Sequence, residues 1–262
     1  MSYKADFHVH SYYSDGTMSP VELVTYYHDQ EYDMIAITDH DGIDGVHDAK
    51  IAGEAIKMGI ISGVEFSTEF EGHELHILGY YFDHENPELI AKCAELKKTR
   101  RERNQRLLDK LAEMGYEMSL EELERQSKKG YVGKPNIARL MVQKGYIKET
   151  KEAFEPGKFF ESPEVKAIRR KKMDTVEAIE LLKAAGGMAV LAHPGKIKSL
   201  GEKGTEEYWQ NMDSLVKNLK KAGLKGMECF HPAHSEEEAL KFVVIAGKYH
   251  LHITEGSDFH GE

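Results

Sequence analysis

Short apolar strands alternate with amphipathic helices along most of this chain, and this alternation limits the possible folds more than any other feature. The predicted strands are residues 3–9, 33–38, 59–64, 74–81, 188–192, 226–230 and 251–254. Six of the seven lead into a predicted helix, at intervals of about thirty residues. Such alternation is typical of an α/β fold in which helices cover a parallel sheet, either closed into a barrel or open.

Capping signals mark where several of these helices begin. Residues 19–22 read Ser-Pro-Val-Glu, which combines an N-cap serine, a proline at the first helical position and a glutamate that completes a capping box. Residues 119–122 and 235–238 carry the same serine and glutamate spacing. We therefore expect a helix to begin at each of these three places.

A long charged segment interrupts the alternation between the fourth and fifth strands. Residues 87–114 predict one long helix, further helices are expected from residue 119 and over residues 134–144, and residues 146–173 are expected to be irregular. We interpret residues 97–172 as a helical insertion. The remaining two parts, residues 1–96 and 173–262, would then form one discontinuous barrel domain.

The charge of the chain is divided unevenly between these parts. Residues 97–172 hold 21 Lys+Arg against 12 Asp+Glu, a net charge of +9, whereas the remainder holds 14 against 33, a net charge of −19. An acidic body attracts metal cations, and a basic wall beside it attracts an anionic substrate. The alternative interpretation is a charged, solvated helical surface with no ligand.

Composition favours a soluble intracellular protein. Hydrophobic residues make up 40% of the 262 residues, enough for a sizeable core. No apolar run approaches the roughly 18 residues of a membrane-spanning helix, and the N-terminus lacks the pattern of a signal peptide. Cys93 and Cys229 lie far apart in apolar segments, so we expect buried, reduced thiols and a cytoplasmic location.

Side chains that bind metals recur where the predicted strands end. In Asp6-Phe7-His8-Val9-His10, a strand conformation points the acidic residue and both histidines to one face. The carboxyl ends of barrel strands meet at one end of the barrel, where active sites lie. The candidate ligands there are His8, His10, His40, Glu65, His193, Asp258 and His260, with His76 inside the fourth strand as the exception. The sequence therefore predicts a metal site at this end.

These residues also carry a family resemblance. The ordered motifs D-F-H-V-H, S-D-G, T-D-H-D, G-V-E-F-S, H-I-L-G-Y, L-A-H-P-G and G-S-D-F-H-G resemble those of the PHP (polymerase and histidinol phosphatase) family of metal-dependent phosphoesterases. The resemblance spans nearly the whole chain outside the insertion. Within the family, S-D-G after the first motif and the helical insertion resemble stand-alone members that dephosphorylate nucleoside 3′,5′-bisphosphates or trim short RNA from its 5′ end. The resemblance implies a distorted seven-stranded (β/α)7 barrel of PHP type with a helical insertion.

The resemblance further implies two to three divalent metal ions, Mn, Zn or Fe. The first would be held by His8, His10, Glu65 and Asp258, the second by Glu65, His76 and His193, and the third by Asp15, His40 and His260. A bridging Glu65 would keep two cations about 3.5–4 Å apart, so that a hydroxide between them is a nucleophile at neutral pH. We expect Glu65, Asp258 and His193 to be the catalytic residues.

Several acidic residues near these motifs have two interpretations. Asp15 is either a metal ligand or a turn-capping residue, and histidinol phosphatases of the family usually have histidine there. Asp6 is expected to orient a ligand histidine through its second ring nitrogen. Asp39 and Asp41 either do the same or cap the next helix.

Four further residues are candidates for substrate binding. Lys134 and Lys196 are expected to bind phosphate, although relatives usually place arginine at one or both positions. A lysine neutralises phosphate as a point charge but lacks the bidentate fork of arginine. His231 and His234 lie at the end of the sixth strand and either contact the substrate or help the next helix to begin.

Together these features predict a metal-dependent phosphoesterase that acts on a nucleoside 3′,5′-bisphosphate or on the 5′ ends of short oligonucleotides. The first alternative is a histidinol-phosphate phosphatase, against which Asp15 and the size of the insertion argue. The second is a structural PHP module without activity. The third is a nucleic-acid-binding protein, which the lack of interleaved aromatic residues in the insertion disfavours. Because relatives usually continue past Gly261, we expect a C-terminal segment beyond this chain.

Overall fold

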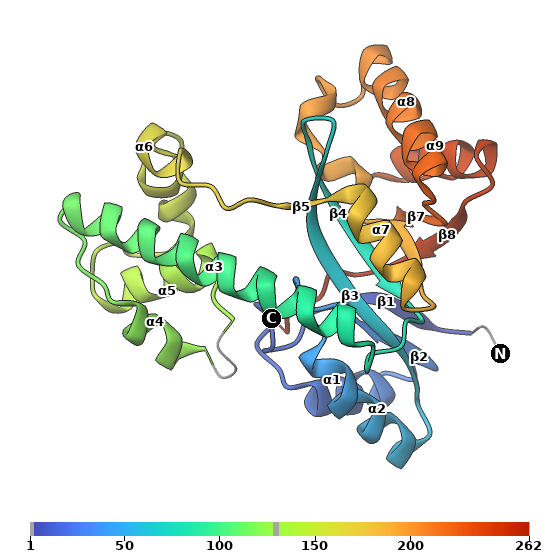
Figure 1. Cartoon of the computed structure of the whole chain (residues 1–262), viewed down its shortest axis with the longest axis horizontal. Coiled ribbons are helices and arrows are strands. Elements are labelled where there is room, and N and C mark those ends of the chain that lie inside the picture. The colour runs from blue at the N-terminus through green and yellow to red at the C-terminus, as the bar shows by residue number, and fades with distance from the viewer. Residues whose placement is uncertain (1–2, 128–130, 262) are drawn as a thin grey trace.

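The computed structural model describes residues 3–127 and 131–261 and shows an α/β barrel from which a group of helices extends (Figure 1). The sheet has the strand order β1-β2-β3-β4-β6-β7-β8, and β5 pairs with β3 outside this path. The strands are β1 (Ala5–Val9), β2 (Met34–Ile37), β3 (Gly59–Phe70), β4 (His73–Tyr80), β5 (Met173–Asp174), β6 (Met188–Leu191), β7 (Gly226–Phe230) and β8 (His252–Glu255).

The two ends of the strand path approach each other and nearly close the sheet. A parallel bridge joins Val9, at the end of β1, to Phe259, which follows β8. The N–H of His10 donates to the carbonyl of Phe259 at 2.8 Å. The barrel of seven strands expected from the sequence is therefore confirmed.

Strand β4 departs from the expected parallel sheet. It runs antiparallel to both neighbours, β3 and β6. A two-residue turn at Glu71 and Gly72, both with positive φ, joins β3 to β4, and such a short connection allows only a hairpin. The expectation of a wholly parallel sheet was wrong at this strand. Since β4 doubles back along β3, His76 lies opposite Ser67, close to Glu65, although it is in mid-strand.

Five helices accompany the barrel strands in the chain. They are α1 (Pro20–Asp29), α2 (Asp44–Ile56), α7 (Thr175–Ala184), α8 (Glu206–Ala222) and α9 (Glu236–Lys248). Short 3-10 turns η3 (Pro194–Lys196) and η4 (Lys198–Leu200) follow β6. The capping boxes expected at residues 19–22, 119–122 and 235–238 are all present, each with its serine accepting a hydrogen bond from the glutamate N–H.

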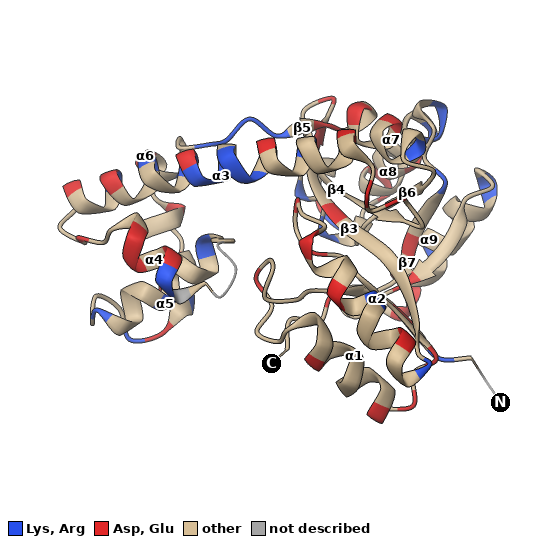
Figure 2. Ribbon diagram, turned by 60° about the horizontal axis from the view of Figure 1, so that its bottom comes forward, with Lys and Arg blue, Asp and Glu red and all other residues tan. Residues whose placement is uncertain are grey.

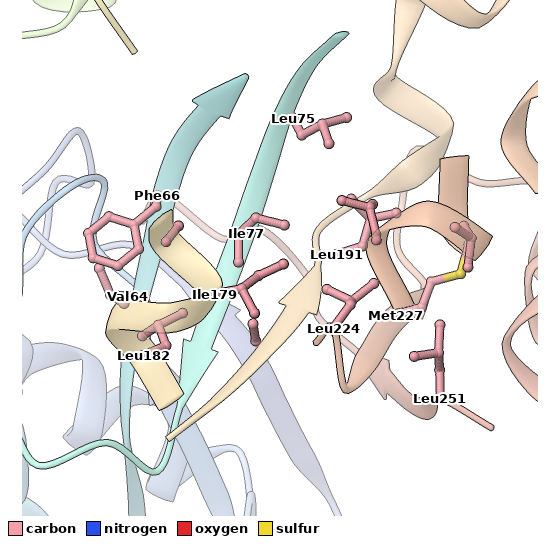
Figure 3. Close-up of a cluster of buried hydrophobic side chains, with 14 of the residues drawn as sticks. Val64, Phe66, Leu75, Ile77, Ile179, Leu182, Leu191, Leu224, Met227 and Leu251 are labelled. Carbon is pink, nitrogen blue, oxygen red and sulfur yellow. The ribbon is translucent and has the colours of Figure 1, made fainter. Parts of the chain in front are cut away.

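The main hydrophobic core lies between the sheet and these helices. Figure 3 shows Phe66 of β3 and Ile77 of β4 beside Ile179 and Leu182 of α7. Helix α7 approaches β4 so closely that a Cβ atom at Gly79 would lie 2.3 Å from Leu182 Cδ2. Burial of a side chain of this size stabilises the fold by roughly 1.5–3 kcal/mol. This packing holds β3 and β4, which carry Glu65 and His76, in a fixed register.

A single long helix, α3 (Pro87–Glu113), joins the barrel to the extending helices. Its first half places Leu89 and Leu96 in the barrel core, and its second half places Leu107 and Leu111 in a separate core. The second core also includes side chains of α4 (Leu120–Gln126), α5 (Lys134–Gln143) and α6 (Pro163–Lys166). We call this second half of α3, together with α4, α5 and α6, the helical arm (Figure 1).

Residues 146–173 are more regular than the sequence predicts. They contain η1 (Thr150–Phe154), η2 (Phe159–Glu161), α6 and the start of β5. Each of these elements has five residues or fewer, too short to show a hydrophobic period of its own. Packing of buried side chains such as Phe160 and Val165 against the arm core stabilises them instead. Within residues 3–127 and 131–261, no helix is both long enough and apolar enough to span a bilayer.

Candidate metal centre

The strand ends and the loops after them bring all the predicted metal ligands to one end of the barrel. The set is His8, His10, Asp15, His40, Glu65, His76, His193, Asp258 and His260. The segment after β2 continues beside β3, because the N–H of Asp41 donates to the carbonyl of Glu65 at 2.9 Å. That pairing places His40 directly beside Glu65.

Glu65 lies at the middle of this group and has no exposed surface. Nitrogen atoms of five histidines lie 2.7–3.4 Å from its carboxylate: His8, His10, His40, His76 and His193. Burial alone would raise the pKa of Glu65, but the surrounding imidazoles, His40 foremost, outweigh burial and hold its pKa well below the usual range. Glu65 is therefore an ionised carboxylate inside the protein.

The two oxygens of Glu65 face different histidines. Oε1 lies 2.7 Å from His76 Nδ1 and 2.9 Å from His193 Nε2. Oε2 lies 3.4 Å from both His8 Nε2 and His10 Nε2. This division is what a carboxylate needs in order to bridge two cations.

The His8 and His10 side of Glu65 fits a metal ion. Their Nε2 atoms lie 3.5 and 3.1 Å from Asp258 Oδ1. Metal–ligand bonds of about 2.0–2.2 Å at tetrahedral angles place ligand atoms about 3.3–3.6 Å apart. His8 Nε2, His10 Nε2 and Glu65 Oε2 are buried without a hydrogen-bond partner, a costly state that coordination to a cation would relieve.

A second group of ligand atoms lies beside the first. Atoms of His10, Asp15, His40 and His260 all lie within 4.8 Å of one another. Asp15 Oδ1 is 3.3 Å from His260 Nε2, and Asp15 Oδ2 is 3.7 Å from His40 Nε2. His40 Nδ1 is also 2.8 Å from Glu65, so this histidine lies between the two groups. Asp15 faces imidazoles here, which favours a ligand role over simple turn capping.

The electrostatics of the centre favour cations. Burial opposes the ionisation of Asp15 and Asp258, but the imidazoles around them outweigh burial and hold both pKa values below the usual range. Burial lowers the pKa of His10 to about 4. Glu65 and Asp15 outweigh burial at His40 and raise its pKa to about 9. The carboxylates are thus ionised at neutral pH and provide the negative charge that divalent ions require.

Glu228 is a buried residue of this centre that the sequence analysis missed. It lies in β7 with no exposed surface, accepts a hydrogen bond from His8 Nδ1 at 2.9 Å, and accepts another from the His193 N–H at 2.6 Å. Fixing the proton of His8 on Nδ1 turns its Nε2 lone pair toward the centre. A Cβ atom at Gly256 would lie 2.6 Å from Glu228 Oε1, so only glycine fits there. The available signal was one acidic residue within an apolar strand.

The predicted roles of the neighbouring aspartates need correction. Asp6 does not contact a histidine ring. It accepts hydrogen bonds from the backbone N–H groups of His8 and Ser257, at 3.1 and 3.0 Å, and from the hydroxyl of Tyr27 at 2.7 Å. Asp6 therefore ties the start of the barrel to its last strand, and Glu228 orients the ring instead.

Asp39 and Asp41 also differ from expectation, since neither orients a ligand ring nor caps a helix. Asp39 accepts hydrogen bonds from the N–H and hydroxyl of Ser11 and from the hydroxyl of Ser14, which holds the loop that carries Asp15. Asp41 accepts from the Ser67 N–H at 2.9 Å. Its other oxygen accepts hydrogen bonds from Arg100 of α3 and from Arg170, which lies between α6 and β5.

These arginines belong to a buried cluster of cations beside the metal centre. Arg100 and Arg170 both donate to Asp41 Oδ2. Arg103 is 8% exposed, and no carboxylate of a described residue pairs with it. Three guanidinium nitrogens are buried without a partner: Arg100 Nε, Arg103 Nε and Arg170 Nη1. Among the described residues, Asp41 is the one carboxylate that pairs with the cluster, through Arg100 and Arg170. Burial lowers the pKa of Arg103 to about 10.

The cluster lines a cavity of about 550 Å³, which we call the basic basin. Its wall includes Asp15, His40 and His76 at the metal end and Arg100, Arg103 and Lys134 toward the arm. Figure 2 shows Lys and Arg gathered on the middle of α3 and along the segment that leads into β5. The excess positive charge of this region can be counted from the sequence, but which arginines are buried in it cannot.

Three of the four predicted substrate-binding residues line or border the centre. Lys134 lines the basic basin, and burial lowers its pKa. Lys196 Nζ lies 2.6 Å from Asp258 Oδ2. His231 Nε2 is 3.4 Å from the same oxygen, and its Nδ1 accepts the Ala233 N–H at 2.9 Å. The neutral ring of His231 therefore carries its proton on Nε2, directed at the centre.

His234 has a different position from the one expected. Its Nε2 accepts the Gly195 N–H at 3.1 Å, and its Nδ1 donates to the carbonyl of Cys229 at 2.9 Å. Both ring nitrogens are thus engaged within the protein, so His234 connects two loops and does not point a polar atom at the centre. The helix-entry alternative is closer to this role than substrate contact.

The amino-acid sequence is similar to those of known proteins over nearly the whole chain. The PHP domain family matches residues 6–229. A 5′-3′ exoribonuclease of Haemophilus influenzae is 32% identical over 260 residues, covering 99% of this chain and 91% of the relative. A phosphoribosyl 1,2-cyclic phosphate 1,2-diphosphodiesterase of Eggerthella lenta is 30% identical, covering 98% and 94%. A 3′,5′-nucleoside bisphosphate phosphatase of Chromobacterium violaceum is 28% identical, covering 97% and 86%.

A solved structure is similar to this one in fold. It is a Bifidobacterium adolescentis protein assigned as a metal-dependent phosphoesterase, with a TM-score of 0.85 and 28% identity. The similarity covers 100% of this chain and 89% of that one. The solved protein therefore has a similar fold over the full length of this chain.

Removal of a central carboxylate is expected to remove metal. Glu65→Gln and Asp258→Asn keep side-chain shape but remove the negative charge, so each should lower Mn²⁺ affinity by more than about 100-fold while the protein stays folded. Metal content after dialysis and circular dichroism measure the two effects. Glu237→Gln, at an exposed carboxylate of α9, is the matched control. Full metal occupancy in Glu65→Gln would contradict the assignment.

Glu228→Gln is expected to lower metal affinity less than Glu65→Gln or Asp258→Asn does. The amide can still accept one hydrogen bond but no longer stabilises the Nδ1 proton of His8 with a charge. Loss of such an outer partner typically costs about 10- to 100-fold in metal affinity, which chelator competition measures. An unchanged affinity would show that Glu228 has no part in orienting His8.

Proposed function

Since the chain belongs to the PHP domain family, we propose that it is a metal-dependent phosphoesterase of small nucleotides. Its substrate is a nucleoside 3′,5′-bisphosphate or the 5′ end of a short oligonucleotide, in keeping with the names of the relatives. The observation that carries the proposal is Glu65, whose two oxygens face two groups of ligands. Beside it lies a basin lined by Arg100, Arg103 and Arg170, each of which has one buried guanidinium nitrogen without a partner.

We propose that the centre holds three divalent ions, Mn, Zn or Fe. The ligand sets are those expected from the sequence: His8, His10, Glu65 and Asp258; Glu65, His76 and His193; Asp15, His40 and His260. When bound, such ions lower the pKa of water and neutralise charge on a phosphoryl group. In this proposal Glu65, Asp258 and His193 are the catalytic residues, because they hold the ions that contact the reacting phosphate.

Side chains around the ions are suited to bind the reacting phosphate. His231 points Nε2–H toward the centre, where it can donate to a phosphate oxygen. Lys196 contacts the same oxygen of Asp258 as His231 does, Oδ2, and adds a positive point charge. With these donors and the ions in place, no serine or cysteine nucleophile is needed, and both cysteines are buried away from solvent.

The basic basin supports a substrate with a second phosphate. Buried guanidinium nitrogens without partners are costly, and a phosphate would satisfy them with charge-assisted hydrogen bonds. Arg103 and Lys134 have no paired carboxylate among the described residues to compete for them. Histidinol phosphate, which bears one phosphate and an amine, would bring a like charge to these cations. The basin therefore favours a nucleoside bisphosphate over that alternative.

The experiment that tests the proposal compares two substrates with Mn²⁺-loaded protein. Phosphate release from adenosine 3′,5′-bisphosphate is expected to proceed with a kcat/KM at least about tenfold above that from histidinol phosphate, because one charge-assisted contact is worth roughly 1.5–3 kcal/mol. Glu65→Gln is expected to be inactive on both. A preference for histidinol phosphate, or turnover of neither compound, would contradict the proposed function.

Arg103→Ala and Lys134→Ala test the role of the basin. Each is expected to raise KM for adenosine 3′,5′-bisphosphate by about tenfold or more and to change kcat much less, since these residues bind a phosphate that does not react. Lys98→Ala removes an exposed cation from α3, the helix that carries Arg103, and serves as the control. An equal loss of kcat in Arg103→Ala and Lys134→Ala with KM unchanged would place them in the chemical step instead.

A further inference from the structure

A second large cavity lies outside the metal centre, between the start of α2 and α3. Its volume is about 660 Å³, within the range of roughly 300–1,000 Å³ for small-molecule sites. It shares His40, Arg100 and Tyr131 with the basic basin. Nothing in the metal chemistry or the phosphate binding proposed above uses this space.

The wall of this cavity differs in chemistry from that of the basin. Ile43 and Cys93, both buried, and the methyl group of Ala94 contribute apolar surface. Tyr13 and Tyr131 add aromatic rings near the metal centre, and Arg100 lies over the Tyr131 ring at 4.4 Å. Polar and charged side chains complete the lining: Asp41, Asp44, His47, His84, Glu85 and Lys97. A flat ligand with an apolar face and polar edges suits such a wall, whereas the wall of the basin suits an anion.

Three spaces meet at one residue. A third cavity, of about 650 Å³, lies beside Lys196 and Asp258. Among the described residues, His40 alone lines this third cavity, the basic basin and the cavity between α2 and α3. The ribose of a nucleoside 3′,5′-bisphosphate likewise carries three substituents, namely two phosphates and a base. If one phosphate lies at the metal centre and the other at the arginines, the base remains to be placed. The cavity between α2 and α3, which has apolar and aromatic surface as well as polar groups, matches the flat face and polar edges of a base.

We propose that the cavity between α2 and α3 is the nucleobase subsite of this enzyme. The inference rests on the proposed function, because it takes a nucleotide as the substrate. It adds that binding of the base is separable from binding of either phosphate. The residues concerned are Ile43, Cys93 and Ala94, together with the rings of Tyr13 and Tyr131.

Ala94→Trp is the variant that tests the subsite. Ala94 lies on α3 at the cavity wall and is itself exposed, so a larger side chain there fills the cavity without entering the core. Ala112→Trp makes the same change at an exposed position of the same helix within the arm. It is the matched control for helix propensity and for an added aromatic surface.

Two substrates separate the base from the phosphates: adenosine 3′,5′-bisphosphate and its abasic analogue, 1-deoxyribose 3,5-bisphosphate. With Mn²⁺-loaded full-length protein, the unmodified chain is expected to prefer the adenosine compound in kcat/KM by roughly 5- to 100-fold, the usual value of one base against aromatic groups. In Ala94→Trp the ratio of the two kcat/KM values is expected to fall to about one. In Ala112→Trp this ratio is expected to stay as in the unmodified chain.

Two kinetic outcomes would overturn the inference. No preference in the unmodified chain, or a preference that Ala94→Trp leaves unchanged, would show that the base does not use this cavity. If the unmodified chain hydrolyses neither compound, the proposed function fails, and calorimetric titration with both compounds still decides the inference. There, tighter binding of the adenosine compound that disappears in Ala94→Trp supports the subsite, and equal binding of the two compounds overturns it.

Discussion

A single ionised carboxylate, held inside the protein, determines the arrangement of this end of the barrel. Glu65 has no exposed surface, and an ion so placed is strongly unfavourable unless opposite charge or hydrogen-bond donors surround it. The histidines around it come from β1, the segment after β2, β4 and the segment after β6. These elements lie far apart in the sequence, and their contacts with Glu65 hold them in place relative to one another. The histidines at Oε1 and those at Oε2 therefore depend on the same side chain for their positions.

Much of this could be predicted from the sequence, because local signals and strand periodicity carry it. The capping boxes at Ser19 and Ser235 act within one helical turn, and the family motifs identify the ligand positions with their strands. Three features could not be predicted. The direction of β4 depends on a two-residue turn, the role of Glu228 depends on pairing β7 with distant strands, and the burial of Arg103 depends on how the arm packs. In each case the deciding contact joins residues that sequence patterns treat separately.

The acidic residues around the candidate metal ligands have different positioning roles. Asp6 and Asp39 bind backbone and hydroxyl groups, so they set where the ligand-bearing loops lie. Glu228 acts on the ring of His8 itself. The cations of the basic basin come from α3, from α5 and from the segment before β5, outside the barrel strands. The candidate metal ligands and the basin cations thus come from different parts of the chain, and both border the same space beside His40.

The helical arm is attached to the barrel along two separate paths. Helix α3 leaves the barrel core at one of them, and the chain returns at β5, which pairs with Thr68 and Glu69 of β3 at the other. Because α3 is one continuous helix, the arm can move relative to the barrel only if α3 bends or β5 separates from β3. The width of the basic basin therefore depends on the straightness of α3 and on this short strand pairing.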